Sequence, residues 1–151
     1  IKLLQPYEKN VSNRVIKTPK IYFMDTGLVC FLVGWTSSQV AMNGAMAGGL
    51  FENFVVSEII KSYYNAGHET EKIFFYRDKD KREIDLIIEK DNTLYPIEIK
   101  KSARPGIEMA KHFPVLSKLA DISVGQGCII CQCDKSSYLS DDVVALPIEY
   151  I

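Results

Sequence analysis

Two acids and a lysine, Asp85, Glu98 and Lys100, are spaced so that two neighbouring strands would hold them on one face. Two apolar runs typical of strands, 84–89 and 94–100, flank a short polar turn, which predicts a β-hairpin with a four-residue loop. If the residues next to the loop pair with each other, every further pair keeps the same sum of residue numbers, so Asp85 lies opposite Glu98. Lys100 lies two residues further along, and its side chain therefore points to the same face.

Two carboxylates opposed across a strand pair repel each other, at a cost of up to roughly 1 kcal/mol. A divalent cation, Mg²⁺ or Mn²⁺, would compensate, because hard cations bind one or two carboxylates together with water and substrate phosphate. Lys100 would then orient or deprotonate a water, or stabilise charge on a transferring phosphate. The second interpretation is a solvated hairpin face on which Lys100 neutralises Glu98.

The opposite face of the hairpin is predicted to be apolar and to bury against a helix or core. Strand alternation places on it Ile84, Leu86, Ile88, Ile97 and Ile99.

A helix beginning at Leu50 is predicted ahead of the hairpin, and the sequence Asn65-Ala66-Gly67 supplies its C-terminal stop. Its predicted buried stripe consists of Phe51, Phe54, Val55, Ile59 and Tyr63. Glu52 borders this stripe near the start of the helix. Either the helix dipole alone favours an acid there, or Glu52 is a third acidic ligand held over the sheet.

The remaining elements predict an α/β fold with a central mixed sheet flanked by helices. A strand at 73–77 precedes the hairpin, and a helix through about residue 119 follows it, before strands near Cys128 and at 143–146. At the start of the chain, a short strand at 20–24 leads into a helix capped by Asp25 that ends near Gly34, and residues 36–49 are predicted to form a loop.

Composition is ordinary for a globular protein, with 47% hydrophobic and 25% charged residues among 151. The net charge of −1 provides no global attraction to nucleic acid. No run reaches membrane-spanning length and no signal-peptide pattern occurs, which predicts a cytoplasmic protein with no membrane partner. Because the chain starts at Ile1, we expect it to be the C-terminal piece of a longer protein, with 1–18 as the tail and linker of a preceding segment and 19–151 as the domain.

Three of the four cysteines, Cys128, Cys131 and Cys133, fall in one strand-like run. Alternation points Cys128 to the opposite face from the other two, whereas zinc needs about four convergent ligands. We expect buried, reduced thiols rather than a metal site.

Several stretches resemble the C-terminal domain of a widespread group of prokaryotic AAA-type ATPases, and the likeness covers nearly the whole chain. They are Lys17–Leu28, Gly49–Glu58, Phe75–Asp78, Arg82–Glu89 and Pro96–Lys100. The resemblance implies a nucleotide-binding ATPase domain ahead of this piece, with residues 1–18 as the tail of a preceding winged-helix-like segment. No Gly-x-x-x-x-Gly-Lys-Ser/Thr motif occurs here, so ATP is expected to bind only the missing N-terminal part.

The pattern Glu83-Ile84-Asp85 followed by Glu98-Ile99-Lys100 also resembles the PD-(D/E)xK nuclease superfamily, whose restriction-endonuclease-like core has the order αβββαβ. That resemblance implies Asp85 and Glu98 as metal carboxylates, Glu52 as the helix acid and Lys100 as the catalytic lysine. The stretch before Asp85 lacks the proline of the superfamily's name.

Three functional hypotheses follow. The first is a Mg²⁺-dependent phosphodiesterase acting on DNA or RNA. The second is a non-catalytic module that couples the ATPase to a nucleic acid or protein partner. The third is self-association into a homo-oligomer, with the apolar segment 23–35 as the interface.

Overall fold

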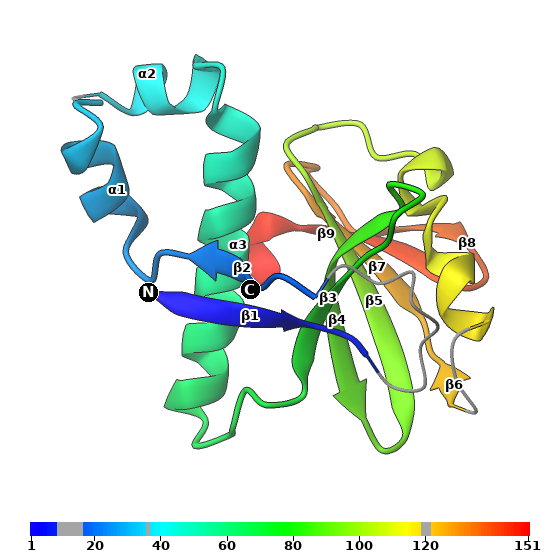
Figure 1. Cartoon of the computed structure of the whole chain (residues 1–151). Helices are drawn as coiled ribbons and strands as arrows, with labels where there is room; N and C mark the ends of the chain where they lie inside the picture. The colour runs from blue at the N-terminus through cyan, green and yellow to red at the C-terminus, as the bar shows by residue number, and fades with distance from the viewer. Residues whose placement is uncertain (9–16, 36, 119–121) are drawn as a thin grey trace.

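The computed structural model describes residues 1–8, 17–35, 37–118 and 122–151. Within these residues, nine strands form one mixed sheet in the order β2-β1-β3-β4-β5-β7-β9-β8, with β6 paired to β5 (Figure 1). The strands are β1 (Lys2–Pro6), β2 (Lys20–Tyr22), β3 (Ile73–Arg77), β4 (Glu83–Lys90), β5 (Thr93–Lys100), β6 (Ser123–Val124), β7 (Gly127–Cys131), β8 (Ser137–Ser140) and β9 (Val143–Pro147).

Helices cover the sheet on both faces. The α-helices are α1 (Thr26–Leu32), α2 (Ser38–Asn43) and α3 (Ala47–Asn65), and the 3₁₀ helices are η1 (Ile107–Ala110), η2 (Phe113–Lys118) and η3 (Ile148–Tyr150). Figure 1 shows α3 along one side of the sheet and η1 and η2 on the other, with α1 and α2 standing away from the sheet. The α/β class and the mixed sheet flanked by helices are therefore confirmed.

The prediction of one long helix through residue 119 was wrong. Two short 3₁₀ helices, η1 and η2, occupy this part of the chain, and residue 119 itself lies outside the described residues. Pro114 explains the difference, because a proline inside an α-helix removes one hydrogen bond and clashes with the carbonyl four residues earlier. The core order is thus α3-β3-β4-β5, a pair of 3₁₀ helices, then β7 and β9.

The β4–β5 hairpin has the predicted register, with Glu89 opposite Leu94. Its loop is shorter than predicted, because Lys90 and Thr93 also pair and leave only two residues in the turn. Those two residues, Asp91 and Asn92, have φ values of 50° and 57°. A two-residue turn with two positive φ angles matches the twist of antiparallel strands.

A β-bulge interrupts β4 near its first residues. The pairing with β3 shifts by one residue between Phe74–Ile87 and Tyr76–Ile84. An inserted residue of this kind reverses the alternation of side chains beyond it. Ile84 therefore packs in the core under η1 and η2, with Tyr76 and Ile87, and its predicted place beside Leu86 was wrong.

The second core lies between α3 and the sheet. Leu86, Ile97 and Ile99 pack there as predicted, with Ile88 partly buried beside them. The helix residues in this core are Phe51, Val55, Val56, Ile59 and Ile60.

Two details of the predicted helix were wrong. It starts at Ala47 rather than Leu50, and Phe54 is exposed rather than part of the buried stripe. The predicted stop is correct, since the helix ends at Asn65 and Gly67 has a φ of 73°. Its buried stripe therefore fixes which face α3 turns to the sheet, and with it the position of Glu52.

The N-terminal part supplies further strands to the sheet. Leu4, in β1, is 1% exposed, and β1 pairs parallel with β3, so the first residues of the predicted tail pack within the sheet. Residues 9–16 of that tail lie outside the described residues, and the boundary between 1–18 and 19–151 stays a prediction. Asp25 caps α1 as predicted, since its carboxylate accepts a hydrogen bond from the Leu28 N–H at 2.8 Å.

The predicted loop at 36–49 was only partly correct. It contains α2 and the first turn of α3. Ser37 caps α2 by accepting a hydrogen bond from the Val40 N–H at 3.3 Å. The helix ends at Asn43 with Gly44 as its C-cap, so start and stop signals were both present in the sequence.

The cysteines are divided between the two faces as predicted. Cys131 and Cys133 are buried in the core under η1 and η2, whereas Cys128 packs against the α3 core. All three are free thiols. Among the described helices, none is long and apolar enough to cross a membrane.

Candidate metal-binding site

Asp85 and Glu98 lie side by side where β4 and β5 separate. The paired register runs from the turn to Leu86 and Ile97. Beyond this pair, a side chain rather than the backbone links the two strands. Asp85 Oδ2 accepts a hydrogen bond from the backbone N–H of Ile99 at 2.9 Å. Asp85 is only 6% exposed, and this bond holds its buried carboxylate in place.

Lys100 bridges the two acids. Its Nζ lies 2.6 Å from Glu98 Oε1 and 3.6 Å from Asp85 Oδ2. The second oxygen of Glu98, Oε2, is buried and has no hydrogen-bond partner among the described residues. Buried polar atoms in native proteins are normally satisfied, so this oxygen is a candidate acceptor for a cation, a water or a proton.

The carboxyl groups of Glu98 and Asp85 both have raised pKa values. Burial, and then the negative charge of Asp85, raise the pKa of Glu98 from 4.5 to about 7. Burial, and then the charge of Glu52, raise the pKa of Asp85. Clusters of carboxyl groups with raised pKa values occur at functional sites because a function requires the charges to be brought together.

Glu52 reaches this cluster from α3, but its carboxylate is held by residues of β2. Glu52 Oε1 lies 2.9 Å from Lys20 Nζ and accepts a hydrogen bond of 2.6 Å from the Tyr22 hydroxyl. Lys20 Nζ in turn lies 4.0 Å from Asp85 Oδ1. Among the described residues, no three Asp, Glu, His or Cys side chains are arranged to hold one metal ion, so Glu52 as a direct ligand remains a prediction.

Glu83 and Arg77 add a second ion pair beside the site. The Arg77 guanidinium donates two hydrogen bonds of 2.9 Å to the Glu83 carboxylate. Glu83 also pairs with Lys20 at 2.5 Å. The sequence reasoning missed Lys20, Tyr22 and Glu83 as site residues.

The only signal for the missed residues was alternation. Glu83 precedes Asp85 by two positions, and Lys20 precedes Tyr22 by two positions, so each pair shares a face of its strand.

The cluster opens into a hollow of about 610 Å³. Its lining residues are Glu52, Glu83, Asp85, Glu98, Lys100, Glu108, Met109, Lys111 and His112. η1 and the residues after it form one wall, which brings His112 to the acids although it lies far from them in sequence. Burial, followed by the charge of Lys111, lowers the pKa of His112.

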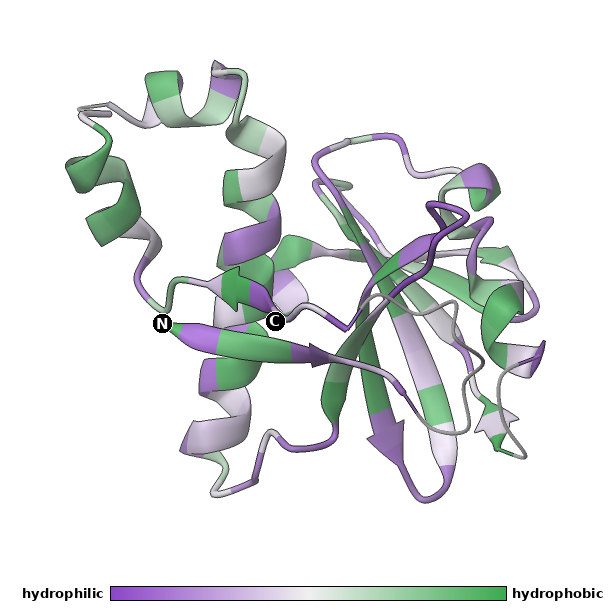
Figure 2. Ribbon diagram, viewed as in Figure 1, coloured by the Kyte–Doolittle hydropathy of each residue, from purple (hydrophilic) through white to green (hydrophobic). Residues whose placement is uncertain are grey.

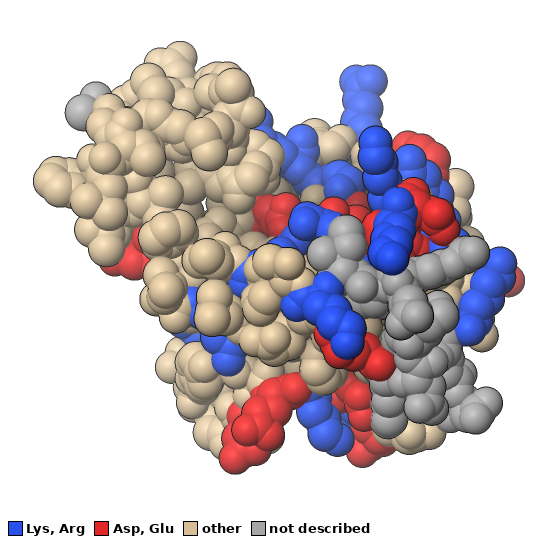
Figure 3. Space-filling view, viewed as in Figure 1, with Lys and Arg blue, Asp and Glu red and all other residues tan. Residues whose placement is uncertain are grey.

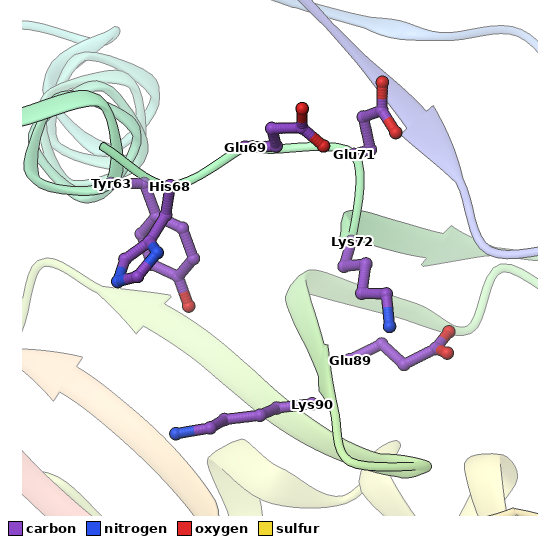
Figure 4. Close-up of a pocket in the computed structure, with 7 residues that line it drawn as sticks. All are labelled: Tyr63, His68, Glu69, Glu71, Lys72, Glu89 and Lys90. Atoms are coloured by element: carbon purple, nitrogen blue, oxygen red, sulfur yellow. The ribbon is translucent and has the colours of Figure 1, made fainter. Parts of the chain in front are cut away.

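A second hollow, of about 380 Å³, lies at the opposite end of α3 (Figure 4). His68 lies against the Tyr63 ring at 6.2 Å between ring centres. Figure 4 shows the carboxylates of Glu69 and Glu71 pointing away from the His68 ring. His68, Glu69 and Glu71 are exposed, so this hollow holds the same residue types without bringing them together.

Two family profiles together match most of this chain. Residues 47–151 match the profile of a family described as Domain of unknown function (DUF4143). The chain belongs to this family. Residues 1–39 match a second profile, described as Domain of unknown function (DUF8612). In this DUF4143 chain, the site therefore combines residues from both matched segments, since Lys20 and Tyr22 lie in the first.

Two relatives match over all 151 residues. They are the uncharacterized proteins Mb2031c of Mycobacterium bovis and Rv2008c of Mycobacterium tuberculosis, each 28% identical to this chain. The chain spans 32% of the length of each relative.

Proposed function

We propose that this chain carries a Mg²⁺- or Mn²⁺-dependent phosphodiesterase site acting on DNA or RNA, in a nuclease-like C-terminal domain of an AAA-type ATPase. The observation that carries the proposal is the buried pair Asp85 and Glu98, bridged by Lys100, with Glu98 Oε2 lacking a hydrogen-bond partner among the described residues. The resemblance of Glu83-Ile84-Asp85 and Glu98-Ile99-Lys100 to the PD-(D/E)xK signature supports the same assignment.

The residues fit a hard cation. Both acids present oxygen donors, as Mg²⁺ and Mn²⁺ prefer. Asp85 is held by the Ile99 N–H through Oδ2, which leaves Oδ1 for a cation, and Glu98 offers Oε2. Glu52 would contribute directly or through water once its carboxylate is released from β2.

In the proposed phosphodiester cleavage, Asp85 and Glu98 would bind the metal and Lys100 would act on the water and the phosphate. A divalent cation bound between Asp85 and Glu98 would supply Lewis acidity and a water of lowered pKa. Lys100, within reach of both acids, is placed to orient the attacking water and to offset charge on the phosphate. Glu98 must lose its proton to bind a cation, so the affinity of the site for metal should rise as the pH increases through about 7.

The test is cleavage of single-stranded DNA, double-stranded DNA and RNA with Mg²⁺ or Mn²⁺. Asp85→Asn, Glu98→Gln and Lys100→Met should each lower the rate by on the order of 100-fold or more. Glu58→Gln is the matched control, because Glu58 lies on the same helix as Glu52 but forms its ion pair with Lys61. Cleavage that survives all three site variants would contradict the proposal.

A second function, non-catalytic binding or self-association, is favoured by the surface of α1 and α2. Residues 26–51 contain no charged side chain, and neither α1 nor α2 has a buried residue. Figures 2 and 3 show this part of the molecule as largely hydrophobic and without Lys, Arg, Asp or Glu, whereas the charged residues gather over the sheet and the 3₁₀ helices. Monomeric proteins rarely expose large apolar patches.

Sedimentation velocity tests this second function. Phe31 is 79% exposed and Leu32 is 67% exposed. If the face joins two copies, the wild type sediments as a dimer and Phe31→Ser with Leu32→Ser sediments as a monomer. A monomeric wild type would remove self-association and leave binding to another partner.

The ATPase part of the proposal depends on the resemblance and on the relatives, which are about three times the length of this chain. The 151-residue chain alone should neither bind nor hydrolyse ATP. Nucleotide binding by this chain, measured by calorimetry, would contradict the assignment of ATP binding to the missing N-terminal part.

A further inference from the structure

Lys20 stands among the acids of the site although it comes from β2, far from the hairpin in sequence. Its Nζ lies 2.9 Å from Glu52 Oε1, 2.5 Å from Glu83 Oε1 and 4.0 Å from Asp85 Oδ1. The side chain is 13% exposed. One ammonium group thus lies within 4.0 Å of three carboxylates from two different elements, α3 and β4.

The lysine is held firmly in this position. Tyr22, two residues along β2, donates a 2.6 Å hydrogen bond to the same Glu52 oxygen that Lys20 contacts. The Phe75 ring lies 5.4 Å from Lys20 Nζ, within the range of a cation–π contact. β2 therefore holds the Glu52 carboxylate through both Lys20 and Tyr22.

The charges of the cluster are nearly balanced without any metal. Four carboxylates face three cations, which are Glu52, Glu83, Asp85 and Glu98 against Lys20, Arg77 and Lys100. A divalent cation gains less from a balanced cluster than from one with excess negative charge, because the fixed cations repel it. Removing Lys20 would leave four carboxylates and two cations.

We propose that Lys20 is an internal counter-ion that competes with a divalent cation for Glu52 and Asp85, so that β2 sets how tightly the site binds metal. The inference rests on the proposed function, because it concerns the same site. β2 belongs to the segment matched by the 1–39 profile, whereas Glu52, Asp85 and Glu98 belong to the 47–151 profile. The affinity of the second segment's site is therefore controlled by a residue of the first.

The experiment measures the dissociation constant for Mn²⁺ by electron paramagnetic resonance at pH 8, together with the metal-free melting temperature. Lys20→Met keeps the length of the side chain and removes its charge. It should bind Mn²⁺ about tenfold more tightly or better, while its metal-free melting temperature falls. Lys20→Arg, which keeps the charge, should bind Mn²⁺ within about threefold of the wild type.

Two further variants make the result specific. Tyr22→Phe releases one hydrogen bond from Glu52 and keeps Lys20, so it should tighten Mn²⁺ binding in the same direction but less. It also serves as the test if Lys20→Met does not fold. Lys61→Met is the matched control, because Lys61 pairs with Glu58 on the outer part of α3 and its loss should leave the Mn²⁺ affinity unchanged.

The outcomes separate this inference from the proposed function. Equal Mn²⁺ binding by wild type and Lys20→Met, or weaker binding by the variant, overturns the competition and leaves the metal site standing. Failure of both proteins to bind Mn²⁺ overturns the metal site and the competition together. Tighter binding by Lys20→Met without any cleavage supports the competition and counts against the nuclease.

Discussion

Two buried acids in neighbouring parts of the sheet have opposite surroundings. Asp78, in the turn between β3 and β4, is 1% exposed. Its carboxylate accepts hydrogen bonds from the Tyr76 hydroxyl, the backbone N–H groups of Asp80 and Arg82, and the Arg82 guanidinium. Glu98, in β5, is buried nearly as deeply, but one of its oxygens has no hydrogen-bond partner among the described residues.

The pKa values follow hydrogen bonding rather than burial. Burial alone would raise the pKa of Asp78, but the hydrogen bonds from Arg82 and Tyr76 outweigh it and lower that pKa. Burial and the charge of Asp85 raise the pKa of Glu98 instead. A buried carboxylate that accepts a full set of hydrogen bonds stabilises the fold. A buried carboxylate that lacks donors and lies beside another acid is unfavourable as an anion unless a cation binds to it. The comparison favours Glu98 over Asp78 as a member of the proposed metal site.

Removing each carboxylate should change stability in opposite directions. Asp78→Ala leaves Tyr76 and Arg82 without their acceptor, and we expect it to lower the free energy of unfolding by about 3–5 kcal/mol. Glu98→Gln should be neutral or stabilising at pH 8 without metal, because it removes an unfavourable charge. Urea unfolding of the two variants measures both effects. A loss from Glu98→Gln equal to that from Asp78→Ala would erase the distinction, and Asp78→Asn replaces Asp78→Ala if the latter does not fold.

The pH dependence of stability should show the raised pKa of Glu98. Between pH 4.5 and about 7 the unfolded chain has lost this proton while the folded chain keeps it, so stability falls as pH rises through this interval. The gap corresponds to a loss on the order of 3 kcal/mol above pH 7. Asp78, with its lowered pKa, acts in the opposite sense, since its contribution is lost only as pH falls below the range where the unfolded carboxyl ionises.

Metal-free thermal melts from pH 4 to pH 8 measure this dependence. Glu98→Gln should flatten the decline between pH 4.5 and 7. An unchanged slope in that variant would assign the decline to other groups.

Added Mn²⁺ should stabilise the protein through Asp85 and Glu98, with a smaller contribution from Glu52. A ligand that binds only the folded state adds about 2.7 kcal/mol at 100 times its dissociation constant, which corresponds to a rise of roughly 5–10 °C in the melting temperature of a domain this size. Asp85→Asn and Glu98→Gln should lose most of this rise, and Glu52→Gln should lose part of it. Asp78→Asn should keep it despite a lower starting temperature, as scanning calorimetry can show.

The smallest effect is expected in the hollow of Figure 4. Glu69 is exposed, so Glu69→Gln should change the free energy of unfolding by less than about 0.5 kcal/mol. It should also leave the Mn²⁺ effect intact, because the carboxylates of Glu69 and Glu71 point away from the His68 ring and lie at the other end of α3 from the candidate site. A variant at Glu69 that abolished the Mn²⁺ effect would move the metal site to the other end of α3.

Local periodicity determined the parts of this protein that depend on near neighbours in the chain. The alternation of β4 and β5 predicted the register that places Asp85 beside Glu98, because a hairpin leaves few other ways to pair two strands. The apolar stripe of α3 predicted which face would bury and that Glu52 would border it. The cap at Asp25 was equally local.

Tertiary packing decided the rest, because contacts between distant elements leave no periodic signal. The bulge that turns Ile84 to the other core depends on how β4 meets β3. Lys20 and Tyr22 reach Glu52 only because β1 joins β2 to the main sheet, which no spacing within β2 encodes. The acids of the candidate site could thus be predicted from the sequence. Lys20, the cation beside them, is brought there by three-dimensional packing.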